Sequence, residues 1–188
     1  MTSDLYRYII NIVNIINDVN LGGEPLNTLI IYASKNGSTE KAAKLLYNKI
    51  EGEKSIINIR VEEHPNLENY GTVILGGSIY AGNIQKEIQN FVEKNLDLLL
   101  TKKIGLFLCC GMEENYKKQL EQSFPKKLLN HSITNQYFGF EYNKNKMNLI
   151  EKALIKLVVK GKTNLSNILE DNIERLALDI QGDIKVDQ

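Results

Sequence analysis

The sequence predicts an α/β fold in which a five-stranded parallel sheet is wound on both faces by helices. Short, continuous apolar runs, such as residues 29–33 and 104–110, alternate with segments of helical periodicity. Strands that are apolar along their whole length are typical of a parallel sheet covered on both faces. The chain has 188 residues, 43% of them hydrophobic, which suits one domain with a substantial core. We expect the strand order 2-1-3-4-5, one of the two common doubly wound orders.

Residues 1–27 precede this pattern and are interpreted as an N-terminal helical arm. Apolar side chains recur at helical spacing over residues 3–20, and the sequence Gly22-Gly23-Glu24-Pro25 ends the helix. Asparagine and aspartate interrupt the apolar residues, and no basic n-region or cleavage site is present, so the arm is unlike a signal peptide. We expect it to pack on its own domain or on the partner of a homodimer.

The domain itself is expected over residues 28–182, and residues 183–188 form a tail. Its elements follow from apolar runs of strand length and from helical periodicity between them. The expected strands are 29–33, 55–61, 70–77, 104–110 and 133–140, and the expected helices are 39–50, 84–100, 113–124, 146–160 and 166–181.

Charge and cysteine content exclude several classes of function. Lysine plus arginine equals aspartate plus glutamate, at 23 each, so no overall field attracts nucleic acid. The adjacent Cys109 and Cys110 are poorly placed for a structural disulfide, which is typical of a reducing compartment. His64 and His131 are far apart, and no metal-ligand spacing is present. No stretch approaches the ~18 apolar residues of a membrane span, so we expect a soluble cytoplasmic protein.

The loop after the first strand is a candidate phosphate site, because ligands of doubly wound sheets bind at the carboxyl ends of strands. It reads Ser34-Lys35-Asn36-Gly37-Ser38-Thr39 and leads into a helix. Gly37 lets the backbone turn, so that successive N–H groups form an anion-binding nest reinforced by the helix dipole. Hydroxyl and amide side chains add donors. The alternative is an ordinary loop with a Ser/Thr helix cap, since neither the Walker pattern nor G-x-G-x-x-G is present.

The strand, this loop and the following helix resemble the FMN phosphate site of flavodoxins. The usual flavodoxin pattern is Thr-x-Thr-Gly-x-Thr; here Ser34 replaces the first Thr and Asn36 the middle one. In the flavodoxin-like, menaquinone-dependent protoporphyrinogen oxidases the middle residue is an Asp, so Asn36 is closer to that branch. The resemblance covers about residues 28–182 and implies FMN as the cofactor.

A second signature occupies residues 76–83, after the third expected strand. It resembles the Gly-x-Ser-Ile-x-x-Gly segment of the protoporphyrinogen oxidase branch, in which this loop covers one face of the flavin ring. The resemblance implies cofactor contacts by Ser78, Ile79, Tyr80, Ala81 and Gly82. An aromatic ring stacked on the flavin contributes about 0.5–1.5 kcal/mol beyond its buried area, and Tyr80 is the candidate. The alternative is a glycine-rich turn with a half-buried tyrosine.

A third segment, residues 109–116, follows the fourth expected strand at the position of the other flavin loop. The resemblance implies contacts by Cys110 and Gly111, and Met112 or Tyr116 is a candidate for the outer face of the ring. Because Cys109 and Cys110 end an apolar strand, we interpret them as core or site-lining thiols. The sequence offers no defensible general base, so its catalytic residues stay unassigned.

Residues 144–162 carry six lysines against one glutamate, Glu151, together with an apolar stripe. This segment resembles a helix that the protoporphyrinogen oxidase branch carries after its last strand and that compact flavodoxins lack. A basic amphipathic helix suits an anionic membrane surface or an acidic substrate; alternatively, it packs on the core with solvated lysines. Three interpretations therefore stay open for residues 146–160: peripheral contact at the inner membrane surface, contact with an acidic substrate, and packing on the core.

Three classes of function remain open. The first is an FMN-dependent oxidoreductase of the protoporphyrinogen oxidase or quinone-linked type, with a quinone or a protein as redox partner. The second is a soluble flavodoxin electron carrier, which would be expected to be more acidic than this neutral chain. The third is a non-redox binding module on the same fold. None of the three involves nucleic acid.

Overall fold

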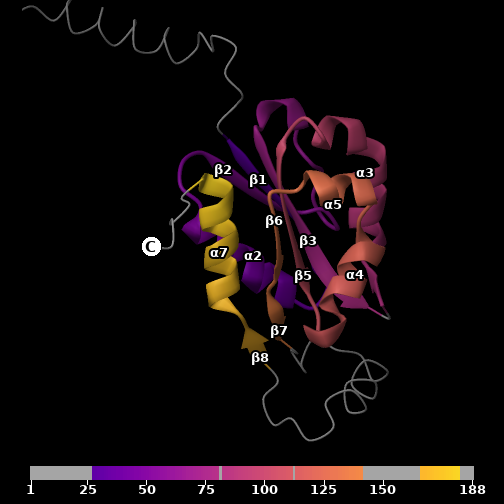
Figure 1. Cartoon of the computed structure of the whole chain (residues 1–188). Helices are drawn as coiled ribbons and strands as arrows, with labels where there is room; N and C mark the ends of the chain where they lie inside the picture. The colour runs from indigo at the N-terminus through magenta and orange to yellow at the C-terminus, as the bar shows by residue number, and fades with distance from the viewer. Residues whose placement is uncertain (1–26, 81, 112, 142–165, 183–188) are drawn as a thin grey trace, which may run out of the picture.

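The computed structural model contains a central parallel sheet with helices on both faces (Figure 1). It describes residues 27–80, 82–111, 113–141 and 166–182. The sheet has the order β2-β1-β3-β5-β6, and every neighbouring pair in it is parallel. One short strand, β4, pairs antiparallel with the end of β3. The parallel strands taken alone follow the order 2-1-3-4-5, which confirms the predicted fold class.

The main sheet comprises β1 (Thr28–Ala33), β2 (Lys54–Asn58), β3 (Thr72–Tyr80), β4 (Asn83–Ile84), β5 (Lys103–Cys109) and β6 (Thr134–Tyr137). A second, two-stranded antiparallel sheet comprises β7 (Gly139–Glu141) and β8 (Ser166–Ile168). The helices are α2 (Ser38–Lys49), α3 (Lys86–Leu99), α4 (Tyr116–Ser123), α5 (Lys126–His131) and α7 (Glu170–Gln181), with 3-10 turns η1 (Leu67–Asn69) and η2 (Glu113–Asn115).

The core has two layers, because successive side chains of a strand point to opposite faces of the sheet. On β1, Leu29 and Ile31 pack in the layer that holds α3, α4 and α5. Ile30 and Tyr32 pack in the other layer, against α2 and α7. Figure 1 shows these two groups of helices on opposite sides of the sheet. Burial on both faces explains why the strands read as continuous apolar runs.

Two expected strands are shorter than the sequence suggested. The strand predicted over 55–61 ends at Asn58, because the N–H groups of Val61 and Glu62 both turn back to the Asn58 carbonyl at 3.0 Å. The strand predicted over 133–140 is divided into β6 and β7. Gly139 has a φ of 78°, a left-handed conformation that interrupts an extended strand.

Three further differences concern strand and helix assignment. The helix predicted over 166–181 begins only at Glu170, because Ser166–Ile168 pairs with Gly139–Glu141 as a strand. Helix α5 (Lys126–His131) lies in a stretch for which the sequence suggested no helix. The third strand continues to Tyr80, so most of the second signature is strand.

Several predictions fall outside the described residues. They are the arm of residues 1–26 with its homodimer contact, Ala81, Met112, the basic helix over 146–160 with its membrane contact, and the tail 183–188. Within the part of the chain that the structure describes, no helix is long and apolar enough to cross a bilayer.

Candidate cofactor site

The phosphate-loop candidate lies between β1 and α2 and turns at a left-handed glycine. Gly37 has a φ of 93° and is the N-cap of α2, a left-handed conformation that its lack of a Cβ permits. Its N–H donates to the Ser34 hydroxyl at 3.1 Å, which closes the turn. The first N–H groups of a helix have no partner inside the helix, which makes the start of α2 a candidate point for an anion.

The loop is joined to the second signature by a side-chain hydrogen bond. The amide nitrogen of Asn36 donates to the Tyr80 hydroxyl at 3.1 Å, across 44 positions of sequence. Asn36 is buried, whereas Tyr80 is 39% exposed. This contact joins two of the three segments that the sequence assigned to one cofactor, and the Thr39 hydroxyl of the first loop lies near Cys109 of the third.

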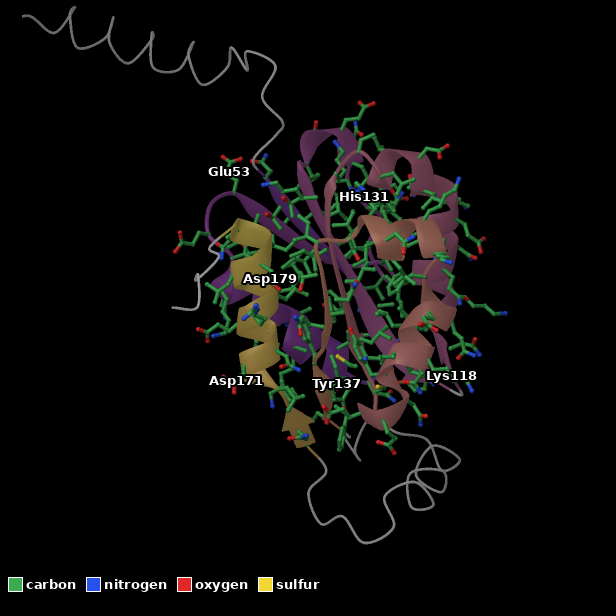
Figure 2. All side chains as sticks on the ribbon, in the orientation of Figure 1. Glu53, Lys118, His131, Tyr137, Asp171 and Asp179 are labelled. Carbon is green, nitrogen blue, oxygen red and sulfur yellow. The ribbon has the colours of Figure 1, made fainter. Side chains whose placement is uncertain are left out.

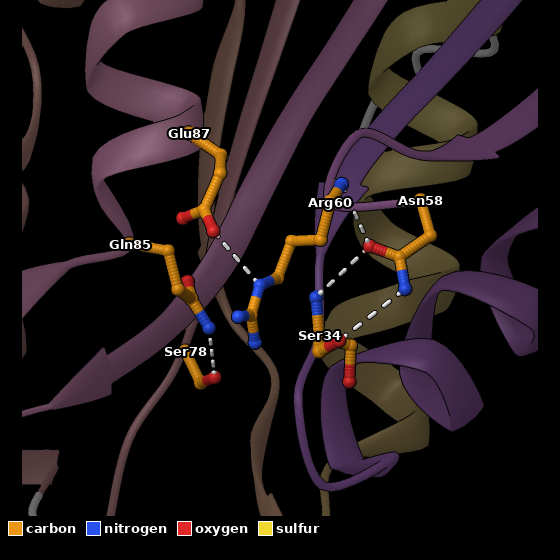
Figure 3. A network of polar contacts seen from close by, with 6 residues as sticks. All are labelled: Ser34, Asn58, Arg60, Ser78, Gln85 and Glu87. Atoms are coloured by element: carbon orange, nitrogen blue, oxygen red, sulfur yellow. Dashed lines mark hydrogen bonds and ion pairs between the residues drawn. The ribbon is translucent and has the colours of Figure 1, made fainter. Parts of the chain in front are cut away.

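The second signature is a β-hairpin rather than the open loop that was expected. Tyr80 pairs with Asn83 and Ile79 with Ile84, and Gly82, at φ 86°, lies in the turn. Gly76, Gly77, Ser78, Ile79 and Tyr80 belong to β3. The Ser78 hydroxyl accepts a hydrogen bond from the Gln85 amide at 2.6 Å (Figure 3). The hairpin therefore holds Tyr80 at the carboxyl edge of the sheet.

In the third segment, the backbone of Cys110 is bonded within the protein. The Cys110 N–H donates to the Gly139 carbonyl at 3.0 Å, and the Cys110 carbonyl accepts from the Tyr137 hydroxyl at 2.8 Å. The Tyr116 ring packs against Tyr137, with 5.7 Å between centroids. Burial raises the pKa of Tyr116, and its buried hydroxyl has no hydrogen-bond partner among the described residues. Gly111 is half-buried beside them.

Both cysteines are free and buried. Burial raises the pKa of Cys109 to about 12, which outweighs the opposing effect of the nearby Thr39 hydroxyl. Such a thiol keeps its proton at neutral pH and is a poor nucleophile.

The Thr39 hydroxyl provides a test of whether the loop suits a phosphate. Thr39 is fully buried in the first turn of α2, and its hydroxyl makes no contact of hydrogen-bond geometry with the described residues. A buried polar atom without a partner is costly, and a hydroxyl in the first turn of a helix is a suitable donor to an anion. This donor and the N–H groups of the helix start match the needs of a phosphate monoester.

A contact that the sequence did not predict ties the loop to the two-stranded sheet. The Ser38 hydroxyl accepts a hydrogen bond from the Glu141 N–H at 2.9 Å. The Glu141 carboxylate contacts the Lys41 ammonium at 2.5 Å and the Ser166 hydroxyl at 3.1 Å. Lys41 and then Ser166 hold the pKa of Glu141 below its usual value. No short-range sequence pattern could have revealed this contact, because the residues are about a hundred positions apart.

A hollow at the other end of the sheet does not belong to this site. It has a volume of about 820 Å³ and is lined by residues of the amino ends of β1 and β2 and by η1. Its side chains pair with one another: the Tyr70 hydroxyl donates to Ser55, and the Lys54 ammonium lies over the Tyr47 ring at 4.8 Å. We assign it no ligand.

Comparison with known families agrees with the geometry. A family model described as the flavodoxin domain matches residues 29–167, well over half of the chain. The chain belongs to the flavodoxin domain family. FMN is accordingly its cofactor, and the family is one of flavoproteins of the oxidoreductase type that act with redox partners.

Two curated relatives share part of the sequence. The chain is 30% identical over 73 residues to protoporphyrinogen IX dehydrogenase (quinone) of Escherichia coli strain K12, which covers 37% of this chain and 40% of that protein. It is 33% identical over 91 residues to the flavodoxin-like domain-containing protein BilS of Clostridioides difficile strain CD3, covering 47% and 49%. The chain thus spans less than half the length of the curated relatives that it matches.

Solved structures agree with the fold. A flavodoxin from the domain Archaea superposes with a TM-score of 0.55 at 14% identity, covering 85% of this chain and 99% of that one. The flavodoxin of Streptococcus pneumoniae TIGR4 gives 0.54 at 12% identity, covering 84% and 99%.

Proposed function

We propose that the chain is an FMN-dependent oxidoreductase that transfers electrons from a reduced substrate of the protoporphyrinogen class to a quinone. The partial similarity to a quinone-linked protoporphyrinogen IX dehydrogenase supports this choice within the flavodoxin domain family. In this proposal the phosphate of FMN binds residues 34–39, and the ring lies beside Tyr80 and the segment that contains Cys110 and Gly111.

One observation carries the proposal. Residues 142–165 contain the basic sequence that distinguishes the oxidase branch, and the described residues on both sides of this segment lie next to the phosphate loop. Glu141 pairs with Ser166 in the small sheet, and the Glu141 N–H donates to Ser38 at the start of α2. In this proposal the basic sequence between Glu141 and Ser166 serves an acidic substrate or an anionic membrane surface.

The protein's own contribution is to bind and orient. FMN, when bound, supplies the two-electron redox chemistry, and the residues around it determine its position and exposure. Among the described residues, neither histidine lies at the carboxyl edge. His64 packs against Phe91, and His131 contacts the Lys102 carbonyl just before β5 begins. Figure 2 shows His131 and Tyr137 at opposite ends of β6. We therefore assign no general base.

The test asks whether the positive charge of the basic segment affects turnover without affecting cofactor binding. Lys152, Lys156 and Lys160 are spaced four apart, which would place them on one helix face. Changing all three to Gln should raise the apparent KM for protoporphyrinogen or quinone turnover and flatten its salt dependence, because charge attraction is screened beyond about 8–10 Å. The flavin spectrum should stay unchanged. The control is the triple change of the exposed Lys94, Lys126 and Lys127 to Gln, which alters net charge equally.

A soluble electron carrier is the second candidate, favoured by the match to the flavodoxin domain family. It predicts no turnover of either compound and efficient electron transfer to a protein acceptor. Equal salt dependence in the wild type and in both triple variants would also contradict the proposed role of the basic segment. The peripheral membrane contact and the homodimer belong to the same proposal and are tested by vesicle binding and by mass measurement in solution.

A further inference from the structure

Ser34, the first residue of the phosphate loop, lies beyond the last paired residues of β1 and β2. The parallel pairing of β1 with β2 ends at Tyr32 and Asn58, and the Ile59 N–H donates to the Tyr32 carbonyl at 3.0 Å. The chain then turns away, so β2 offers no backbone group to Ser34. The Asn58 side chain takes that place: its oxygen accepts from the Ser34 N–H, and its nitrogen donates to the Ser34 carbonyl, both at 3.3 Å.

We call this pair of hydrogen bonds between the Asn58 amide and the Ser34 backbone the amide bracket. The pair fixes the orientation of the Asn58 amide. The Ser34 N–H requires an acceptor and the Ser34 carbonyl requires a donor, and a primary amide is the side chain that provides both in one plane. The Asn58 oxygen also accepts from the Arg60 N–H at 3.3 Å, and the Asn58 N–H donates to the Glu62 carboxylate at 2.9 Å. The side chain is therefore held from the turn that follows β2.

The same turn reaches the second cofactor segment. The Arg60 guanidinium contacts the Glu87 carboxylate at 2.9 Å, and Glu87 lies in the first turn of α3. Two residues earlier, Gln85 donates to the Ser78 hydroxyl of β3. Figure 3 shows the contacts that run from Ser34 through Asn58 and Arg60 to Glu87, and the separate contact of Gln85 with Ser78.

We propose that Asn58 is a positioning residue for the cofactor phosphate. It holds Ser34, whose hydroxyl in turn accepts the Gly37 N–H, so that the N–H groups of the loop face the anion before it arrives. Because the loop is ordered before the cofactor binds, the affinity is not reduced by the entropic cost of ordering the loop on binding. Asn58 acts through Ser34 and does not itself contact the cofactor. The inference rests on the placement of the phosphate at residues 34–39.

The experiment compares FMN with riboflavin, which lacks the phosphate, by titration of the full-length apoprotein. Asn58→Leu removes the bracket at nearly constant size, and the Kd for FMN should rise about tenfold, the factor that corresponds to 1.4 kcal/mol. The Kd for riboflavin should change by less than about twofold. Asn90→Leu and Asn90→Asp, at an exposed position of α3, are the controls and should change neither.

Asn58→Asp provides a second variant that keeps both acceptor contacts but loses the donor to the Ser34 carbonyl. It should also weaken FMN binding about tenfold, because the added negative charge repels the phosphate. The loss should be smaller at high salt, because salt screens this repulsion. Equal losses for FMN and riboflavin, or no loss in either folded variant, would overturn the proposal.

Gly37→Val tests the phosphate placement separately. If Gly37→Val abolishes the preference for FMN over riboflavin while the Asn58 variants retain it, the phosphate placement holds and only the proposed role of Asn58 is wrong. If Gly37→Val retains the preference, both the placement and the inference fail.

Discussion

Two loops follow buried parallel strands at the same edge of the sheet, and they use their polar groups differently. In the loop after β1, the buried Thr39 hydroxyl makes no contact of hydrogen-bond geometry with the described residues, and the first N–H groups of α2 have no partner within the helix itself. In the segment after β5, Cys110 has both of its backbone groups bonded inside the protein, to Gly139 and Tyr137. We expect the first loop to receive an anion, whereas the backbone of Cys110 in the second completes the fold.

This difference shows why similar sequence positions do not imply similar roles. Both loops were assigned to the cofactor from their place after a strand, and both assignments stay predictions. The first loop should respond to substitution mainly through cofactor affinity. The second should respond mainly through stability, with any contact to the flavin made by its backbone.

Gly37→Val should produce the largest change. A β-branched residue is strongly disfavoured at a φ of 93°, and its side chain would obstruct the nest, so FMN affinity should fall more than about a hundredfold. Quenching of flavin fluorescence measures the affinity. Gly52→Val is the control, because Gly52 has a φ of 75° and open space around an added Cβ. If both variants bind FMN equally well, the first loop does not hold the phosphate.

Thr39→Ala should separate affinity from stability. Losing a hydrogen bond to a charged group costs about 1.5–3 kcal/mol, so FMN affinity should fall roughly ten- to a hundredfold. The stability of the apoprotein to urea should change little, since the hydroxyl makes no contact of hydrogen-bond geometry with the described residues. Thr134→Ala is the opposite control: its buried hydroxyl donates to Asp179 at 2.7 Å, so stability should fall while affinity remains. Unchanged FMN affinity in Thr39→Ala would contradict the assignment.

Tyr137→Phe tests the second loop. It leaves the Cys110 carbonyl without its donor, which should lower the free energy of unfolding by about 1–2 kcal/mol in urea denaturation. The ratio of FMN to riboflavin affinity should not change. Tyr70→Phe removes a hydroxyl that bonds another hydroxyl, Ser55, and should cost less. A large loss of FMN affinity in Tyr137→Phe would mean that both loops contribute to FMN binding.

The smallest expected effect is an alkaline loss of stability due to Cys109. Its pKa is about 12 in the folded protein against an ordinary 9.0, so the folded state keeps a proton that the unfolded state releases. This contribution is fully present below pH 9 and falls as the pH rises, by about 1 kcal/mol between pH 9 and 10. Cys109→Ala should lose correspondingly less stability over that interval in urea denaturation. Identical pH dependence in both proteins would place the thiol in a more polar environment.

The sequence was most informative where local chemistry decides structure. Continuous apolar runs fixed the positions of β1, β3 and β5, and Gly37 indicated the turn before α2. Errors occurred where distant partners compete with local preference. Residues 166–168 have a helical pattern, yet they pair with β7, and the strand expected to reach residue 61 ends when the chain turns back to Asn58.

By itself, the sequence determined the doubly wound sheet, its strand order and the loop suited to an anion, because burial periodicity and helix-start chemistry act over a few neighbouring residues. Only the tertiary structure decided that Asn36 meets Tyr80, that Asn58 brackets Ser34 and that Ser38 binds Glu141. These pairs are separated by 44, 24 and 103 positions in the chain. Side chains so far apart meet only after the sheet has formed, and no periodicity in the sequence encodes which hydroxyl or amide will then face which partner.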